Sequence, residues 1–379
     1  MGGSGWHRAG KLLAVALLAH SVEALAESSP SCAALQPGEL GPGQSLVVDA
    51  HARYPECGPG ISNGEGYLAL LNSGTYGARA WDVVSPEGSL TGKTLGGGDM
   101  AMDLQGQPSG FHVLKVTPDN GITMNVYTSE GEYVRSVRLV ETDDPPSRVV
   151  NARQGETLVA QWVRRGDGTQ GLRIQFIDPM GLPRTQPLEV VSAPQSEHRA
   201  VLAGVDSNGR VLLLWPESGS STWVGQWRDS NGGILTASFS FPAPTSSTGG
   251  QLHALAGGGL ALQTNGQWVA RFPGGEPLAQ PAPAWLASHP NTQLVLIRGR
   301  QAHVLVPPPT FNAASGCQES LLLFTQDGTA CGEVLLPPEG TTCFQRELGI
   351  GPDGTVIQQL DVSATEEHAC GWRWWPGLL

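Results

Sequence analysis

The feature that most constrains this chain is a repeat of about 49 residues, marked by an aromatic side chain just ahead of a glycine-containing turn. Seven such aromatic residues occur, at similar spacings along the chain. They are Trp81, Tyr127, Phe176, Trp227, Phe272, Phe324 and Trp375. A period of this length indicates one repeated supersecondary unit, because a unit this small cannot bury its apolar face alone and must pack against its neighbours.

A second signal runs in step with the aromatic residues. Short apolar runs rich in Val, Leu and Ile follow a glycine in most copies, as at 110–116 and 209–215. Such runs, bounded by turn formers, are typical of buried strands and are too short for an ordinary helix. With 51 Gly and 29 Pro in 379 residues, the composition also favours an all-β protein with many turns. Each copy is therefore predicted to form four strands, most clearly at 200–239.

A repeated four-stranded meander of this length resembles the blade of a β-propeller. Residues 27–379 resemble, as one domain, the secreted bacterial seven-bladed β-propeller repeat proteins. The resemblance implies an all-β, seven-bladed β-propeller. The sequence lacks the paired motifs of WD40 and kelch repeats and the aspartate box of sialidases. No functional subfamily is matched, and no family's functional residues are carried over.

The two ends of the chain predict how the ring closes. The seventh copy has three expected strands, near 344–349, 355–362 and 371–375, and then the chain stops. Residues 44–49 lie one period upstream of the first copy's final strand. We expect this N-terminal strand to complete the last blade, because that pairing removes two open sheet edges.

The first 26 residues have the layout of a secretory signal peptide. A cationic start that includes Arg8 and Lys11 is followed by an apolar run at 12–19 and small residues at 24–26. This layout predicts cleavage after residue 26 and export to a periplasmic or extracellular location. The apolar run is far shorter than the ~20 residues of a transmembrane helix, so membrane insertion is not expected.

Six cysteines follow the leader, and an even number in an exported chain indicates disulfide bonds. Fifteen connectivities are possible, and neighbour pairing is the one we expect. It joins Cys32 to Cys57, Cys317 to Cys331 and Cys343 to Cys370. The Cys317 to Cys331 pair would need a bend or bulge in its hairpin, and a disulfide near the closing seam is a further expectation. No CxxC motif or Cys and His cluster predicts a metal or another cofactor.

The charge balance limits the partners. With 34 acidic and 22 basic residues, the formal charge is −12, which leaves no basic surface to neutralise a phosphate backbone. Nucleic acid is therefore an unexpected partner. An unidentified protein or a glycan is the expected partner, and the chain itself is expected to be a monomer.

A weak polar funnel is predicted at one mouth of the central channel. Five polar residues fall on the expected first strands of copies two to five, which line the channel of a propeller. They are Asp103, Asn151, Arg153, Arg199 and His253. The alternative is that any closed ring needs polar groups around its wet axis, and that His253 is simply a hydrogen-bonded or exposed imidazole.

The sequence offers no motif for catalysis. No serine has glycine two residues before and two residues after it, so the nucleophile elbow is absent, and the nine histidines are scattered singly. Residues 88–94 resemble a phosphate-binding loop. They follow an expected strand rather than opening a helix, and are better explained as a hairpin turn. No catalytic residue is predicted.

Two further features suggest where a ligand could bind. Copy six carries an insertion at 307–316, which is either a partner site or a tolerated loop held by Cys317.

Among the tryptophans, Trp81, Trp227 and Trp375 occupy the periodic position of the repeat and are expected in the core. Trp223 and Trp285 lie outside that position and are the better ligand candidates.

The sequence therefore favours an exported, non-catalytic propeller that binds a ligand or a protein. The alternatives are a hydrolase acting on extracellular glycan, with carboxylates gathered from several blades, and a structural scaffold. Two carboxyl groups ~5 to 10 Å apart at one mouth would favour hydrolysis.

Overall fold

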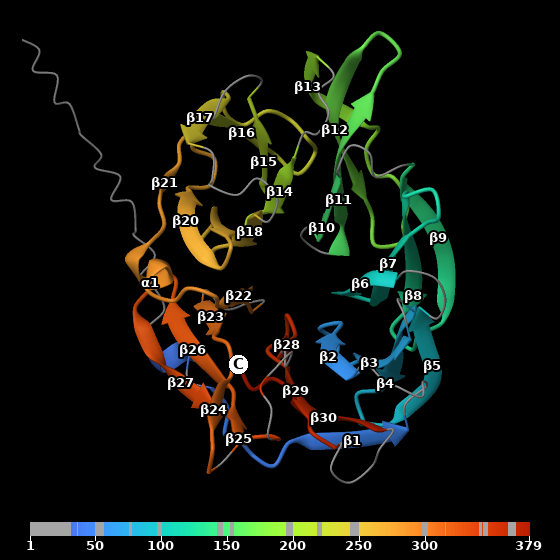
Figure 1. The fold of residues 1–379 in the computed structure, drawn as a ribbon, viewed down its shortest axis with the longest axis vertical. Coiled ribbons are helices and arrows are strands. Elements are labelled where there is room, and N and C mark those ends of the chain that lie inside the picture. Colours follow the sequence, from blue (N-terminus) through green and yellow to red (C-terminus); the bar gives the residue numbers. More distant parts are fainter. Residues whose placement is uncertain are drawn as a thin grey trace, which may run out of the picture.

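Seven four-stranded antiparallel sheets lie radially around a central axis in the computed structural model, which is a seven-bladed β-propeller (Figure 1). The structure describes residues 32–35, 37–49, 57–75, 78–96, 101–141, 147–151, 155–194, 200–217, 222–242, 250–297, 302–314, 316–340, 343, 348–362 and 369–379. The predicted fold class and number of blades are confirmed.

The first four blades follow the sequence from the inner strand to the outer one. Blade 1 comprises β2 (Cys57–Ser62), β3 (Leu68–Thr75), β4 (Ala78–Val84) and β5 (Leu90–Gly96). Blade 2 comprises β6 (Ala101–Gln107), β7 (Gly110–Val116), β8 (Ile122–Thr128) and β9 (Tyr133–Val140). Blade 3 comprises β10 (Ser147–Asn151), β11 (Thr157–Arg164), β12 (Thr169–Ile177) and β13 (Leu188–Pro194). Blade 4 comprises β14 (Leu202–Val205), β15 (Val211–Pro216), β16 (Thr222–Arg228) and β17 (Phe239–Pro242).

The last three blades depart more from the common pattern. Blade 5 comprises β18 (Gly250–Ala254), β19 (Leu260–Thr264), β20 (Gln267–Phe272) and the two-residue β21 (Gln280–Pro281). The short helix α1 (Ala284–Ala287) then leads to blade 6, which comprises β22 (Gln293–Leu296), β23 (Ala302–Val306), β26 (Ser320–Thr325) and β27 (Ala330–Leu335). Blade 7 comprises β28 (Gly349–Ile350), β29 (Val356–Leu360), β30 (Ala369–Trp375) and β1 (Gln44–Asp49).

The periodic aromatic residues are buried within the blades, as expected for the core slot. Each lies on the third strand and pairs across the ladder with a residue of the second strand. The partners are Leu71, Phe111, Leu158, Leu212, Leu260, His303 and Val356. Six of these partners are apolar, and blade 6 alone places a histidine there.

The ring closes as predicted, with the N-terminal strand at the outer edge of the last blade. β1 pairs antiparallel with β30 along its whole length, from Gln44 opposite Trp374 to Asp49 opposite Ala369 (Figure 1). The indole Nε1 of Trp372 donates a hydrogen bond of 2.9 Å to the carbonyl of Gly58 in blade 1. Sheet hydrogen bonds and side chains therefore both join the two ends of the chain.

All six cysteines form disulfides, but the neighbour pairing predicted from the sequence is wrong. The bonds join Cys32 to Cys331, Cys57 to Cys370 and Cys317 to Cys343. Two of them link residues about 300 positions apart, because closure of the ring brings the ends of the chain together in space. The bond from β2 to β30 lies at the closing seam, where a disulfide was expected. Three disulfides indicate an oxidising, exported environment.

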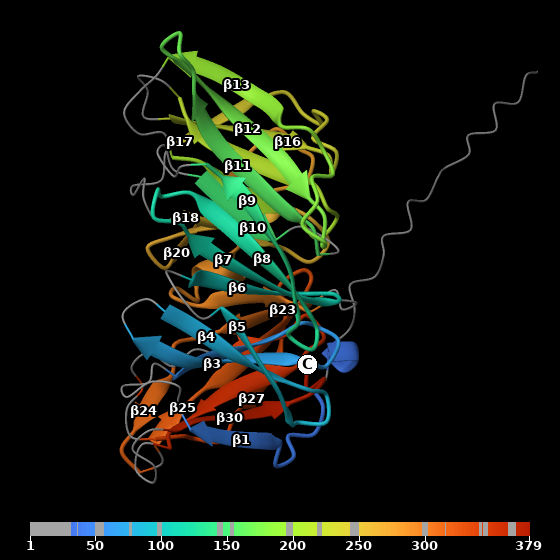
Figure 2. The same ribbon diagram turned by 90° about the vertical axis from the view of Figure 1, so that its right-hand side faces the viewer.

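The insertion of blade 6 forms a small hairpin of its own. Its strands are β24 (Thr310–Asn312) and β25 (Gly316–Gln318). Cys317 ties this hairpin to Cys343, and its carbonyl accepts a hydrogen bond of 3.0 Å from the amide of Glu339. The side view places the hairpin toward the opposite face of the disc from the C-terminus and from η1, a 3-10 turn at Cys32–Leu35 (Figure 2).

The predicted signal peptide lies outside the described residues. Within the ranges that the structure describes, no helix is long and apolar enough to cross a membrane.

Candidate binding site between blades 5 and 6

Two of the five predicted funnel residues lie at different positions along the inner strands of their blades. Asp103 is near the start of β6, whereas Asn151 is the last residue of β10. Surrounding protein raises the pKa of Asp103 above its usual value, because loss of water disfavours the ionised carboxyl.

Arg153 and Arg199 lie outside the described residues. His253 lies on β18 and forms part of the interface between blades 5 and 6. Its ring meets the Trp268 ring edge to face, with centroids 5.0 Å apart. The preceding Leu252 packs with the cluster that faces blade 4, so His253 points to the opposite face of the sheet. The structure does not bring His253 and Asp103 together, and a ligand-binding role for the five residues stays a prediction.

His253 lines a cavity between blades 5 and 6, which we call the insertion-side cavity. Its volume is about 370 Å³. The walls are formed by the inner strands of both blades and by the start of the blade-6 insertion. They comprise Gln251, His253, Asn291, Gln293, Leu294, Val306, Pro307, Pro308, Pro309, Glu319 and Leu348. The segment that sequence analysis singled out as a possible partner site therefore borders this cavity.

The polar groups of the insertion-side cavity differ in how well they are bonded. The Nε2 atom of His253 is buried and makes no hydrogen bond of ordinary geometry with a described residue, although the Leu294 backbone and the Gln263 side chain lie close enough to interact with the ring. Burial lowers the pKa of His253 to about 4, so its ring is neutral at pH 7. Glu319, by contrast, is buried and accepts a hydrogen bond of 2.7 Å from the side-chain amide of Gln358. These two side chains of the wall are therefore a neutral imidazole and a carboxylate that already has a hydrogen-bond donor.

The second cavity lies at the other end of β18, and we call it the helix-side cavity. Its volume is about 340 Å³. The turn after β18, the start of α1 and the last turn of blade 6 enclose it. Its lining comprises Leu255, Ala256, Gly257, Gly258, Arg271, Pro283, Trp285, His303, Gln326 and Asp327.

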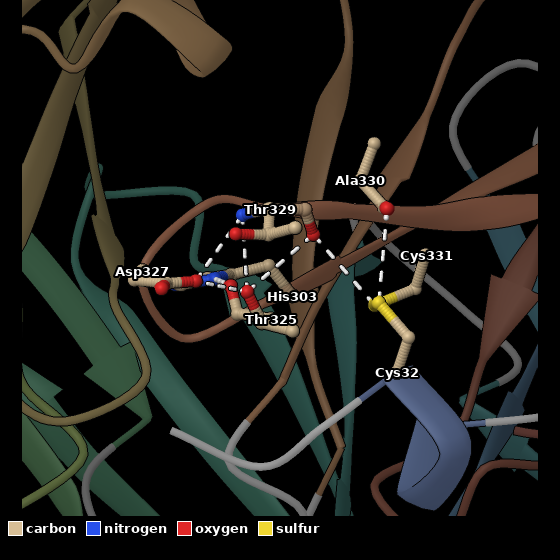
Figure 3. The surroundings of a disulfide bond; sticks show 7 residues. All are labelled: Cys32, His303, Thr325, Asp327, Thr329, Ala330 and Cys331. Atoms are coloured by element: carbon tan, nitrogen blue, oxygen red, sulfur yellow. Dashed lines mark hydrogen bonds between the residues drawn. A yellow bond between two sulfur atoms is a disulfide. The ribbon is translucent and has the colours of Figure 1, made fainter. Parts of the chain in front are cut away.

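His303 forms the buried floor of the helix-side cavity. It is only 1% exposed. Its Nε2 accepts a hydrogen bond of 3.0 Å from the amide of Ala256, and its Nδ1 donates one of 3.0 Å to the carbonyl of Thr325. Burial lowers the pKa of His303 to about 4, so the imidazole is neutral at pH 7. Figure 3 shows His303 beside Thr325 and Asp327, near the Cys32–Cys331 disulfide.

Sequence reasoning missed His303 and Arg271. A signal for the histidine was present in the sequence, because His303 is the one polar residue in the apolar run 302–306. In the structure it lies opposite the periodic aromatic residue Phe324, at a position that is apolar in the six other blades. No comparable signal marks Arg271. It follows Ala270 on β20, and only the register shows that it lies opposite Ala261, on the face toward blade 6.

The tryptophan predictions separate clearly. Trp81, Trp227 and Trp375 are buried, so their assignment to the core is confirmed. Trp223 is also buried, in the cluster between blades 4 and 5, and its selection as a ligand candidate was wrong because the period of the pattern does not report which sheet face it occupies. Trp285 does line a cavity, with its ring centroid 4.7 Å from that of His303.

The described residues contain no group of three or more His, Cys, Asp or Glu side chains placed to hold a metal ion.

No known protein family's profile matches the chain, and no curated protein matches it in sequence. Among solved structures it is similar to prolyl oligopeptidase B from Galerina marginata, with 11% identity, a TM-score of 0.48, and coverage of 87% of this chain and 51% of that one. It thus spans about half the length of that protein. It is also similar to the β-propeller domain of the Trilobed protease from Pyrococcus furiosus, with 14% identity, a TM-score of 0.42, and coverage of 74% of this chain and 82% of that one. A protein of unknown function from Bacteroides caccae is similar at 11% identity, with a TM-score of 0.32 and coverage of 78% and 94%. The propeller assignment stands on the sheet topology of the chain itself, and these likenesses carry no inference about activity.

Proposed function

We propose that this chain is an exported, non-catalytic binding propeller that holds an uncharged, hydroxyl-rich ligand, such as a sugar residue of a glycan, in the insertion-side cavity. The observation that carries the proposal is the insertion-side cavity itself, whose lining combines a neutral imidazole, His253, with three side-chain amides. Side chains of these kinds exchange hydrogen bonds with hydroxyl groups as donors or acceptors.

The remaining wall fits the same chemistry. Gln251, Asn291 and Gln293 each provide an amide that both donates and accepts hydrogen bonds, as a sugar hydroxyl does. The three prolines at 307–309 add an apolar rim against which the carbon face of a sugar can rest. A volume of about 370 Å³ suits a ligand of one or two sugar rings.

The charges of the cavity favour a neutral ligand and binding without hydrolysis. His253 is neutral at pH 7, and the one described carboxylate in the lining, Glu319, is engaged by Gln358. A glycoside hydrolase uses two carboxyl groups flanking the bond that is cleaved. The described lining of this cavity supplies one, and it is already hydrogen-bonded.

The test is binding of the mature chain to an array of neutral oligosaccharides, followed by titration of the best binder against variants. His253→Phe keeps a ring against Trp268 and removes Nε2, and we expect it to weaken binding by about tenfold or more. Gln251→Ala should also weaken binding. Gln267→Ala, on an exposed position of the same blade, is the matched control and should bind like the wild type. Absence of glycan binding, or full binding by His253→Phe, would contradict the proposal.

We also propose that residues 1–26 are the export signal, with delivery to the periplasm or the extracellular space. The three disulfides support export because such bonds persist in oxidising compartments. Mass spectrometry of the exported chain should find Glu27 at its N-terminus. An intact first segment on the exported protein would refute the cleavage.

A further inference from the structure

The helix-side cavity contains one positive and one negative side chain that are not paired with each other. We infer that it binds a small zwitterion of the amino-acid type, with the ligand carboxylate on Arg271 and the ligand ammonium beside Asp327. This site is separate from the one in the proposed function, at the other end of β18 and with a different ligand chemistry.

Arg271 supplies the cationic end. Its Nε is buried and has no hydrogen-bond partner among the described residues. This sets it apart from five other arginines of the described chain, each of which forms an ion pair with a carboxylate. Those are Arg138, Arg165, Arg184, Arg210 and Arg373. The residue as a whole is partly exposed and belongs to the cavity lining, and a planar guanidinium group matches a carboxylate in a two-point contact.

Asp327 supplies the anionic end, at the exposed rim of the cavity. It accepts hydrogen bonds from the hydroxyl of Thr325 and, at 3.2 Å, from the amide of Thr329 (Figure 3). These hydrogen bonds lower the pKa of Asp327, the contact with Thr325 contributing most. The carboxyl is therefore ionised at neutral pH. A simple anion would be attracted by Arg271 and repelled by Asp327, whereas a zwitterion meets an opposite charge at each end.

The wall between the two charges is neutral. Both ring nitrogens of His303 already have partners, and its lowered pKa leaves the ring uncharged above about pH 4. Trp285 adds an apolar surface, backed by Phe324 at 5.1 Å between ring centroids. Arg271, Asp327 and His303 are the titratable groups of the described lining, and their charges sum to zero at pH 7. A cavity of about 340 Å³ holds a free amino acid or a dipeptide.

Calorimetric titration of the full mature chain at pH 7 tests the charge pattern. The probes are leucine, the dipeptide Gly-Leu, N-acetyl-leucine, which lacks the ammonium, and leucinamide, which lacks the carboxylate. We expect leucine or Gly-Leu to bind and each single-charge analogue to bind at least about tenfold more weakly. The comparison of leucine with Gly-Leu tells a free amino acid from a peptide as the source of the zwitterion.

Variants assign the two charges to their side chains. Arg271→Gln should weaken zwitterion binding at least about tenfold and abolish the preference for leucine over leucinamide. Asp327→Asn should instead abolish the preference for leucine over N-acetyl-leucine. Arg135→Gln, at a partly exposed arginine on blade 2, is the matched control and should leave all four affinities unchanged. Glycan binding at the insertion-side cavity should be unaffected by Arg271→Gln, so the two proposals fail separately.

Three results would overturn the inference. They are no heat or saturable signal with either zwitterion at millimolar concentration, equal binding of leucinamide and leucine, or unchanged leucine binding by Arg271→Gln. The analogue series uses only the wild-type chain, so the inference remains testable even if a variant does not fold.

Discussion

The two faces of blade 5 differ sharply in chemistry, although the same three strands build both. Toward blade 4 the strands present Leu260, Leu262 and Phe272, which pack with Trp227 in a continuous apolar cluster. Toward blade 6 the alternate residues include His253 and Arg271, and two cavities lie along that face. Successive side chains of a strand point to opposite faces, so one short sequence can carry two unlike surfaces.

The contrast shows how a propeller can combine closure with recognition. Apolar side chains of adjacent blades pack closely because every methylene removed from water stabilises the contact. Buried polar side chains need hydrogen-bond partners in defined directions. They therefore pack less closely than apolar side chains, and cavities lie beside them on the face toward blade 6. The face toward blade 4 is closely packed, and the face toward blade 6 contains the cavities in which we propose that ligands bind.

The largest expected effect is on the blade 4 side. Trp227 is fully buried, so Trp227→Ala should lower the free energy of unfolding by about 3 to 5 kcal/mol through lost burial and the cavity that remains. Equilibrium unfolding in urea measures the change. A nearly neutral substitution would contradict the view that this face provides the stability.

A charged contact on the same side should come next. The Asp206 side chain has no exposed surface, and its Oδ2 accepts hydrogen bonds of 2.8 Å from Arg210 Nε and 3.0 Å from the amide of Gly259 in blade 5. Asp206→Ala leaves both donors without this acceptor and should cost about 3 kcal/mol. The same urea experiment applies, and Asp229→Ala in an exposed turn of blade 4 is the control. Equal stability of the two variants would refute a structural role for the buried pair.

On the blade 6 side we expect a pH dependence. The folded pKa of His303, about 4, lies below that of an unfolded histidine, near 6.5. Below pH 6.5 the unfolded chain therefore binds more protons than the folded one, and stability falls until the pH reaches about 4. Between pH 7 and pH 5, wild type should lose about 2 kcal/mol more than His303→Gln. Parallel losses in the two proteins would show that this histidine is not kept neutral by burial.

The smallest effect is expected at the wall of the helix-side cavity. Trp285 is only partly buried, so Trp285→Ala should cost about 1 to 2 kcal/mol, well below the cost of Trp227→Ala. Thermal unfolding of the two variants side by side gives the comparison. A loss at Trp285 as large as that at Trp227 would remove the distinction between a sealing face and a binding face.

The sequence predicted the architecture well because the architecture follows from local periodicity. The aromatic spacing gave the number of blades, and the three-strand seventh copy pointed to residues 44–49 as the missing strand. The disulfides were predicted less well. Neighbour pairing assumed that proximity in sequence means proximity in space, which fails where a closed ring brings residues 32 and 331 together.

The candidate sites were the least predictable part. His253 was selected for the channel, but it lies between blades against Trp268, because the sheet face that a residue occupies depends on register and blade order. Arg271 carried no signal at all, since an arginine within a strand is ordinary until its neighbours are known. Trp285 was selected as a ligand candidate only for its departure from the period; it does line a cavity, and its ligand role stays a prediction.

By itself, then, the amino-acid sequence determined the four-stranded repeat, its sevenfold number and the strand that seals the ring, because these depend on alternation and spacing along the chain. Only the tertiary structure decided the disulfide partners, the two unlike faces of blade 5 and the polar groups in its cavities. Those features depend on which distant segments meet across an interface, and a linear pattern carries no information about what lies opposite a side chain in space.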